Sequence, residues 1–395
     1  MSWPRATLGD IFEISSSKRV LKKQWAESGV PFYRAREIVK LAEHGIVDND
    51  LFISEELFDE YRNKYGAPEP GDLMVSAVGT LGACYVVQPN DRFYYKDASV
   101  LRFHPSEEVE PRYIQHAFRT RLLLDQVNSG SGSTVGTFTI SRAKKTKIPL
   151  PPLAEQKRIA AILDAADKLR AKRREAIAQL DTLLQSTFLD MFGDPVTNPM
   201  GWDVVELDSL VEDGDKINYG VVQPGDDYPG GKPLVRVGDF TNGVLSDQSL
   251  KYIDPEVEKK YSRSRLVGNE ILVSCVGSIG NACTVPVAFK GYNIARAVAR
   301  VPLKKGVSRE FILNCIRSKS VQNYFTKQTR TVSQPTLNIS LIKQAPIIAP
   351  PKQQQLKFVQ LVESLRKVQG IGKLHFFELE KLFNSLQQRV FNGTL

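Results

Sequence analysis

The longest regular segment of this sequence runs from Pro151 to Gly193 and has the features of one continuous helix. Pro151 and Pro152 stand at its start, where a helix does not need their missing N–H groups, and Gly193 followed by Pro195 ends it. Because helices of this length are rare inside globular domains, the segment predicts a helix that packs against a partner.

The same segment occurs again from Pro350 to Gly393, shifted by 199 residues (350 − 151). Heptads written from Ile159 and from Phe358 place apolar residues in the same phase. Each apolar stripe is too thin to be buried alone, so we expect the two helices to pair as an antiparallel coiled coil. The alternative is that each helix lies on its own domain. The predicted seam consists of Ile159, Ile162, Leu169, Leu180, Leu183, Phe358, Leu361, Leu365, Leu379, Leu382 and Leu386.

The rest of each half also aligns with the other half. Arg34 matches Arg236, and the segment GDLMVSAVGTLG matches NEILVSCVGSIG, which places Ser76 on Ser274. The sequence therefore predicts an α+β protein built as a tandem repeat of two modules, each a β-rich domain followed by a long helix. The predicted boundaries are 1–150 for the first domain, 151–193 for the first helix, 194–349 for the second domain and 350–395 for the second helix.

Local patterns within each domain predict particular elements. Residues 73–78 and 271–276 are short apolar, β-branched runs bounded by glycine, which indicates strands. The V-G-[TS]-[LI]-G turns that follow them are expected to need positive φ at their glycines. Residues 112–127 and 309–325 have helical spacing and are expected to pack on the sheets.

Composition limits the possible functions only loosely. Lys and Arg exceed Asp and Glu by 53 − 44 = 9, which weakly favours a polyanionic partner. The four cysteines form no C-x-x-C pair and the four histidines form no ligand-spaced cluster with them, so we expect reduced thiols and no metal. The sequence shows neither a signal peptide nor a long apolar run, and we expect a cytoplasmic protein that does not enter a membrane.

Catalytic motifs are missing from the sequence. There is no G-x-x-x-x-G-K-[ST] phosphate loop, no G-x-S-x-G, no H-E-x-x-H and no Asn/Asp-Pro-Pro-aromatic tetrapeptide of amino-methyltransferases. What the halves share is mostly hydrophobic framework and turn glycines. The sequence therefore predicts a binding protein without cofactors rather than an enzyme.

The halves differ most in two polar loops, residues 128–147 and 326–344. A shared scaffold with unlike Ser, Thr, Gln and Arg side chains is suited to reading two unlike stretches of DNA, because these groups bond base edges and phosphates. A flexible surface loop is the alternative. The candidate DNA-binding residues are Ser17, Lys18, Arg19, Arg34, Arg36, Ser131, Ser133, Thr134, Lys144 and Lys145 in the first half, and Tyr219, Gln223, Arg236, Arg263, Arg265, Arg296, Thr331, Ser333, Gln334 and Thr336 in the second.

The helix entries IPLPPLAEQ (148–156) and IIAPPKQQQ (347–355), with the junction FLDMFGDPVTNPMGW (188–202), resemble the DNA-specificity subunit of Type I restriction-modification systems. The resemblance implies that each domain reads one half of a bipartite target in double-stranded DNA and that the helix pair fixes the spacing. It further implies that the subunit is not catalytic and recruits two adenine-N6 methyltransferase subunits, with restriction subunits as further partners. The chain departs from the family pattern at PPKQQQ and at Gly370-Ile371-Gly372, which is expected to kink the second helix or allow close helix approach.

Two other interpretations remain open at this stage. The chain could be a coiled-coil adaptor that binds only protein, in which case exchanging its domains leaves DNA specificity unchanged. It could also be a detached piece of a single-chain restriction-methylation enzyme, which predicts a methyltransferase motif that these 395 residues lack.

Overall fold

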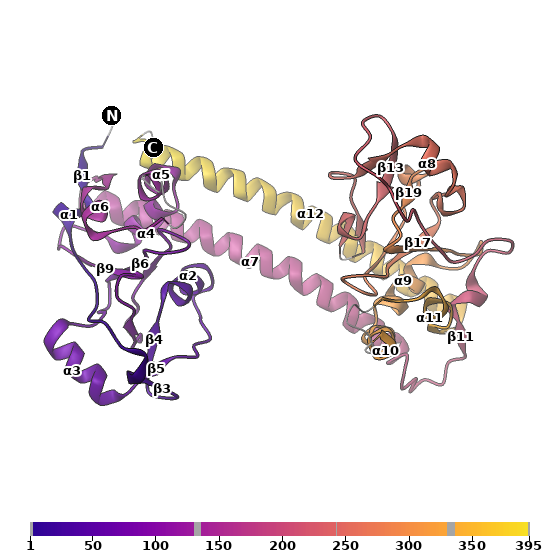
Figure 1. Cartoon of the computed structure of the whole chain (residues 1–395), viewed down its shortest axis with the longest axis horizontal. Helices are drawn as coiled ribbons and strands as arrows, with labels where there is room; N and C mark the ends of the chain where they lie inside the picture. Colours follow the sequence, from indigo (N-terminus) through magenta and orange to yellow (C-terminus); the bar gives the residue numbers. More distant parts are fainter. Residues whose placement is uncertain (1–2, 130–135, 242, 330–335, 394–395) are drawn as a thin grey trace. The chain divides into compact units, whose positions relative to one another are not determined.

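The computed structural model describes residues 3–129, 136–241, 243–329 and 336–393. The chain divides into two compact units, Met1–Arg174 with Leu374–Leu395, and Glu175–Lys373. Each unit holds one globular domain and one half of each long helix (Figure 1).

The first unit begins with short strands and helices and ends with the start of the first long helix. Its elements are β1 (Arg5–Thr7), α1 (Leu8–Ile11), β2 (Phe12–Ser15), η1 (Lys22–Gln24), β3 (Trp25–Ala26), β4 (Val30–Tyr33), α2 (Ala35–His44), β5 (Phe52–Ile53), α3 (Glu55–Tyr65), β6 (Leu73–Ser76), β7 (Cys84–Val86), β8 (Tyr94–Tyr95), β9 (Val100–Pro105), α4 (Pro111–Phe118), α5 (Arg121–Asn128), α6 (Ile140–Lys145), β10 (Lys147–Pro149) and α7 (Leu153–Phe192), whose second half belongs to the other unit.

The second unit repeats much of this order. Its elements are β11 (Val204–Glu206), η2 (Leu207–Leu210), β12 (Asn218–Tyr219), β13 (Lys232–Val235), η3 (Val237–Asp239), β14 (Phe240–Thr241), β15 (Val244–Leu245), β16 (Lys251–Ile253), α8 (Pro255–Lys259), η4 (Ser262–Ser264), β17 (Glu270–Ser274), β18 (Ala282–Thr284), η5 (Val287–Phe289), β19 (Asn293–Ile294), β20 (Val298–Pro302), α9 (Arg309–Arg317), α10 (Lys319–Thr329), α11 (Ile339–Lys343), β21 (Pro346–Ile348) and α12 (Lys352–Phe391), which ends in the first unit.

The sheets confirm that the two domains are copies of one fold. A four-stranded sheet has the order β2-β9-β6-β7 in the first unit and β12-β20-β17-β18 in the second. The parallel pair β4-β8 has its counterpart in β13-β19, and the two-stranded sheet β1-β10 has its counterpart in β11-β21.

Both long helices contribute to the hydrophobic core of each domain. In the first unit, Ile159 and Leu163 of α7 and Phe383 and Val390 of α12 are buried in the same cluster as the four-stranded sheet. In the second unit, Phe188 and Phe192 of α7 and Phe358 and Val362 of α12 are buried in the core in the same way. Each core therefore requires one helix from its own module and one from the other.

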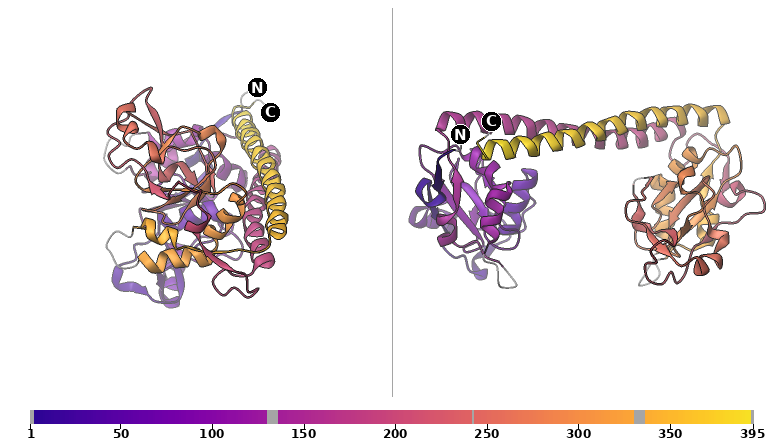
Figure 2. Two further views of the ribbon diagram at one scale, coloured as in Figure 1. Left: turned by 90° about the vertical axis from the view of Figure 1, so that its right-hand side faces the viewer. Right: turned by 90° about the horizontal axis from the view of Figure 1, so that it is seen from above.

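Side-chain contacts establish the antiparallel direction of the helix pair within each unit. In the first unit, Arg170 of α7 makes two hydrogen bonds of 2.7 Å to Glu380 of α12, and its guanidinium stacks on Phe383. In the second unit, Gln369 of α12 donates to Asp181 of α7 at 3.0 Å. In the first unit Arg174 likewise lies over Phe376, and in the second Gly372 lies beside Ile177, so within each unit residue numbers rise along one helix as they fall along the other. In each unit the globular domain covers one side of the pair (Figure 2). The predicted antiparallel pairing is confirmed.

One half of the predicted heptad frame is displaced by one residue. Ile159 and Phe358 are buried and Leu180, Leu365, Leu379 and Leu386 are partly buried, as expected, and Ile162 is partly buried. However, Leu169, Leu183, Leu361 and Leu382 are 59, 48, 47 and 65 % exposed, whereas the next residues, Arg170, Leu184, Val362 and Phe383, face the partner helix or the core. The sequence left this choice open because several of these positions, such as Leu183-Leu184 and Leu382-Phe383, carry apolar residues side by side.

Two further expectations can be compared with the structure. Gly79, Gly82, Gly277 and Gly280 have φ between 75° and 79°, so the predicted positive φ of the turn glycines is confirmed. The two segments with helical spacing are helical, and each forms two helices, α4 and α5 in one and α9 and α10 in the other.

The two glycines inside α12 have different environments. α12 continues through both of them. A Cβ atom at Gly370 would meet nothing within 4 Å, whereas one at Gly372 would lie 3.4 Å from Cγ1 of Ile177 on α7. Of the two predicted consequences, close approach of the helices therefore applies at Gly372.

This difference predicts opposite effects on stability. Gly370→Ala is expected to raise the free energy of unfolding by up to about 1 kcal/mol, the helix-propensity gain of alanine over glycine. Gly372→Leu is expected to lower it, because the larger side chain forces α12 away from Ile177. Denaturant titration of both variants measures the two changes. A loss of stability in Gly370→Ala, or none in Gly372→Leu, contradicts this description of the helix contact.

Candidate nucleic-acid interface

Several connections of the first domain meet where β2, β4 and β6 end. The N–H of Ala77 donates to the carbonyl of Ser99, and the N–H of Phe138 donates to the carbonyl of Ala77, at 2.8 and 2.9 Å. The N–H of Ala98 donates to Oγ of Ser16, and Val78 forms a bridge with Thr137. We call this group, residues 16–19, 77–80, 96–99 and Thr137, the loop edge of the first unit.

The second domain has the same arrangement, which we call the loop edge of the second unit: residues 219–223, 275–278, 295–297 and Thr336. The N–H of Cys275 donates to the carbonyl of Ala297 at 2.7 Å, and the N–H of Leu337 donates to the carbonyl of Cys275 at 2.9 Å. Val276 forms a bridge with Thr336. The repeat therefore places corresponding connections at corresponding edges.

A shared turn protrudes at both loop edges. Oγ of Ser76 donates to the carbonyl of Thr80 and accepts the N–H of Ala83 at 2.9 Å, and Oγ of Ser274 donates to the carbonyl of Ser278. The tips of the turns, Thr80 and Ser278, are exposed hydroxyl residues. The repeated serine in both motifs thus fixes the shape of the turn.

The remaining residues of the two loop edges are unlike. In the first unit, Ser17 donates to the carbonyl of Tyr95 at 2.7 Å, and the ammonium of Lys18 lies 5.3 Å from the ring centre of Tyr65. Arg19 is exposed beside them. In the second unit these places are taken by Tyr219, whose hydroxyl donates to the carbonyl of Leu337 at 3.0 Å, and by the exposed Gln223 and Arg296. The structure therefore brings the predicted residues Ser17 to Arg19 together, and likewise Tyr219, Gln223, Arg296 and Thr336.

Three of the predicted arginines are tied to carboxylates next to these edges. Arg34 and Arg36 both bond the buried carboxylate of Glu37, and both reach Asp50. Burial opposes ionisation of Glu37, but the hydrogen bonds from the two arginines outweigh it and lower the pKa of Glu37 from 4.5 to about 2. In the second unit, Arg236 bonds the buried Asp239 at the corresponding place.

The pair Arg263 and Arg265 on and after η4 differs in its partners. Arg265 makes two hydrogen bonds, of 2.9 and 2.7 Å, to the buried carboxylate of Glu258. Arg263 is exposed, and no partner of its guanidinium is found among the described residues. Of the two, Arg263 is therefore the cation available to a ligand.

Other predicted residues lie elsewhere or cannot be placed. Lys144 and Lys145 belong to α6, which packs against α1. Because α1 leads into the start of β2, and the loop edge lies after the end of β2, these lysines are not at the loop edge. The remaining predictions, Ser131, Ser133, Thr134, Thr331, Ser333 and Gln334, lie outside the described residues.

Sequence reasoning missed Arg142, which lies within the first polar loop and joins two described parts of the chain there. Its guanidinium donates to the carbonyls of Val127 and Thr137, at 2.7 and 2.8 Å, and also to that of Ser129. One arginine thus joins the end of α5 to the start of the segment that leads into α6. The equivalent position in the second half is Leu341. A comparison of the two halves would therefore have shown that Arg142 differs between them, but not what it bonds.

The described residues offer no obvious site for metal chemistry. The four cysteines are buried and unpaired. No group of three or more His, Cys, Asp or Glu side chains in the described parts of the chain could hold a metal ion. None of the described helices is long and apolar enough to span a membrane.

Solved structures share this fold over nearly the whole chain. One, from a study of complex assembly and conformational transition of the type I R-M system, covers 100 % of this chain and 98 % of its own with a TM-score of 0.62 and 18 % identity. The S subunit of a Type I restriction-modification system from M. genitalium covers 99 % and 96 % with a TM-score of 0.55 and 16 % identity. These likenesses show that the chain shares its fold with both structures.

Sequence comparison agrees with the structural comparison. The family described as "Type I restriction modification DNA specificity domain" matches residues 2–179 and again 199–371. The Type I restriction enzyme EcoBI specificity subunit of Escherichia coli is 28 % identical over 398 residues, which is 92 % of this chain and 79 % of that protein. A specificity subunit of Haemophilus influenzae is 35 % identical over 164 residues, 41 % and 40 % of the two chains.

The chain therefore belongs to the Type I restriction-modification DNA specificity family, with two copies of the family domain. Members of this family recognise the DNA target and are not catalytic, because catalysis lies in partner subunits. The prediction of a binding subunit rather than an enzyme is confirmed.

The Arg34–Glu37 cluster predicts a pH-dependent term in stability. Because the pKa of Glu37 is lower in the folded protein than its ordinary value, the stabilisation is fully present above about pH 4.5 and is lost as the pH falls towards 2. Glu37→Gln is expected to remove this term, about 3 kcal/mol at most. Urea unfolding measured between pH 6 and pH 3 tests this.

The matched control is Glu43→Gln, an exposed glutamate on the same helix. It is expected to retain the pH dependence of the wild type. If Glu37→Gln and the wild type lose stability in parallel below pH 4.5, the two arginines do not hold Glu37 ionised.

Proposed function

We propose that this chain reads a bipartite sequence in double-stranded DNA, with one half-site assigned to each domain, and positions two adenine-N6 methyltransferase subunits on it. The observation that carries the proposal is the repeated loop edge, which has the same framework but different polar side chains in the two units. A common framework with different polar side chains is what two different half-sites require.

The shared and unlike parts of each loop edge suit different kinds of DNA contact. The turn tips Thr80 and Ser278 are exposed hydroxyl residues on turns held by the same serine contact, and hydroxyl groups contact phosphates without reading sequence. Ser17 to Arg19 in one unit and Tyr219, Gln223 and Arg296 in the other are different, and base-edge contacts depend on such differences.

Repeated apolar positions on the long helices support two equivalent docking faces. Leu169 and Val368 are related by the shift of 199 residues, as are Leu183 and Leu382, and all four are 48 to 65 % exposed. Leu169 and Leu382 belong to the first unit, and Leu183 and Val368 to the second. One such pair in each unit gives each of two methyltransferase subunits an equivalent apolar contact, because repeated units present the same surface twice. Restriction subunits would join the same assembly.

Single-molecule methylation mapping tests the proposal. DNA is taken from a methylation-free host that expresses the chain with its methyltransferase, and from one that expresses the methyltransferase alone. An adenine-methylated motif in two defined parts with a fixed gap, seen only with the chain present, is the expected result. If both proteins are expressed and bind each other but no new motif appears, the chain acts as an adaptor and the proposal fails.

Arg142 provides a test of one domain alone. Arg142→Met is expected to lower selectivity for the first half-site by roughly tenfold, comparable to one mismatched base pair, because the carbonyls of Val127 and Thr137 lose their common donor. The second half-site should be read as before. Leu341→Met, at the equivalent position of the other unit, is the control and should change neither half. Equal loss at both half-sites of the Arg142 variant contradicts the assignment of one half-site to each domain.

A further inference from the structure

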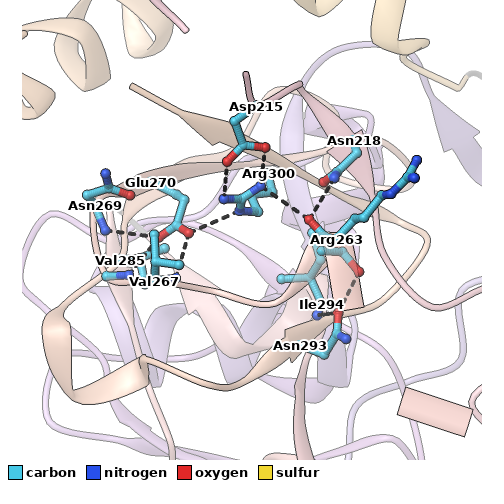
Figure 3. A network of polar contacts seen from close by, with 12 residues as sticks. Asp215, Asn218, Arg263, Val267, Asn269, Glu270, Val285, Asn293, Ile294 and Arg300 are labelled. Atoms are coloured by element: carbon cyan, nitrogen blue, oxygen red, sulfur yellow. Dashed lines mark hydrogen bonds and ion pairs between the residues drawn. The ribbon is translucent and has the colours of Figure 1, made fainter. Parts of the chain in front are cut away.

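A buried arginine lies at the centre of a polar network in the second domain. Arg300 of β20 is 3 % exposed, and its guanidinium bonds Glu270 at 3.0 Å and both carboxylate oxygens of Asp215 at 2.9 and 2.6 Å (Figure 3). Glu270 in turn accepts the N–H groups of Val267, Gly268 and Asn269. Two carboxylates therefore fix the guanidinium of Arg300 in one place.

The network also holds the backbone of η4. Nη1 of Arg300 donates to the carbonyl of Arg263 at 3.3 Å, and Nδ2 of Asn218 donates to the same oxygen at 2.9 Å. The side chain of Arg263 points away from these groups (Figure 3). The main chain of Arg263 is thus fixed by two donors while its guanidinium stays exposed and without a described partner.

The position of η4 connects this network with the loop edge of the second unit. η4 packs between β12 and β19, and Oγ of Ser264 donates to Asn293 of β19 at 2.7 Å. β12 continues into residues 219–223 and β19 into residues 295–297, both of which belong to the loop edge. Arg263 therefore lies against Asn218, the residue that precedes Tyr219 of the loop edge.

The first domain has the equivalent arginine–carboxylate pair of this network but not the bond from the arginine to a backbone carbonyl. Arg102 bonds Asp72, as Arg300 bonds Glu270, at positions related by a shift of 198 residues. The other contacts of Arg102 are with Glu69 and His104, and no described hydrogen bond joins its guanidinium to a backbone carbonyl. The first unit has no 3-10 helix between α3 and β6 among its described elements, so the clamp on η4 is a property of the second domain.

We propose that Arg263 is a phosphate-binding residue of the second domain and that Arg300, with Asn218, is the positioning residue that fixes it towards the DNA backbone. The proposal rests on the function proposed above. A guanidinium on a fixed main chain loses less conformational freedom on binding than one on a mobile loop, and arginine bonds phosphate oxygens with two donors. Such a contact adds affinity without reading bases.

The test measures DNA binding by the complex of this chain with its methyltransferase subunits, on a duplex that contains the methylated motif. Arg263→Ala is expected to weaken binding roughly fivefold at 0.15 M salt and to reduce the slope of log K against log salt by about one. Arg300→Lys, which keeps a charge for Asp215 and Glu270 but cannot donate as a fork, is expected to cause a similar loss. In the Arg263→Ala background, Arg300→Lys should cause no further loss, because it acts only through Arg263.

Two further variants make the result decisive. Asn218→Ala removes the second donor to the Arg263 carbonyl and leaves the buried ion pairs intact, so it serves if Arg300→Lys does not fold. Lys305→Ala removes an exposed cation that follows the end of β20, whereas residues 295–297 of the loop edge precede β20, and it should change neither affinity nor slope. If the wild-type complex binds its motif and Arg263→Ala binds equally well, or if the losses of Arg263→Ala and of the positioning variant add, the inference is wrong. If the wild-type complex shows no bipartite motif, the proposed function itself fails.

Discussion

The packing of both long helices into each domain core is the constraint on which the rest of the structure depends. Ile159 and Leu163 of α7 need Phe383 and Val390 of α12 to close the first core, and Phe188 of α7 needs Phe358 of α12 to close the second. A single helix of this length exposes too much apolar surface to be stable alone. Each module therefore becomes a complete domain only together with the helix of the other.

Polar contacts set the register that hydrophobic packing leaves open. Arg170 with Glu380 in one unit and Gln369 with Asp181 in the other occupy positions related by the 199-residue shift, so an equivalent polar contact occurs in each unit. Apolar side chains at adjacent positions could pack in more than one register, whereas a two-donor arginine contact has one geometry. Within each unit, a polar contact therefore fixes the register of the two helices.

The sequence was sufficient for those features that depend on local chemistry or on repetition. The helix ends, the tandem repeat and the positive φ of Gly79 and Gly277 all follow from residue type and position. Half of the predicted heptad frame was displaced by one residue, because pairs such as Leu183-Leu184 place an apolar side chain at either of two adjacent seam positions. The partners of Arg265 and Arg300 could not be predicted, because Glu258, Asp215 and Glu270 reach them only through the folded chain. For the same reason, Arg263 could not be distinguished from its paired neighbour.

The central claim, that each domain reads its own half-site on a spacing set by the helices, is tested most directly by domain exchange. Residues 194–349 are replaced by the corresponding segment of the EcoBI specificity subunit, a relative of this chain, and the methylated motif of the hybrid is mapped. The account predicts a new second half-site with the first half-site and the gap unchanged. A motif identical to that of the parent, or a change in the first half-site, would contradict it.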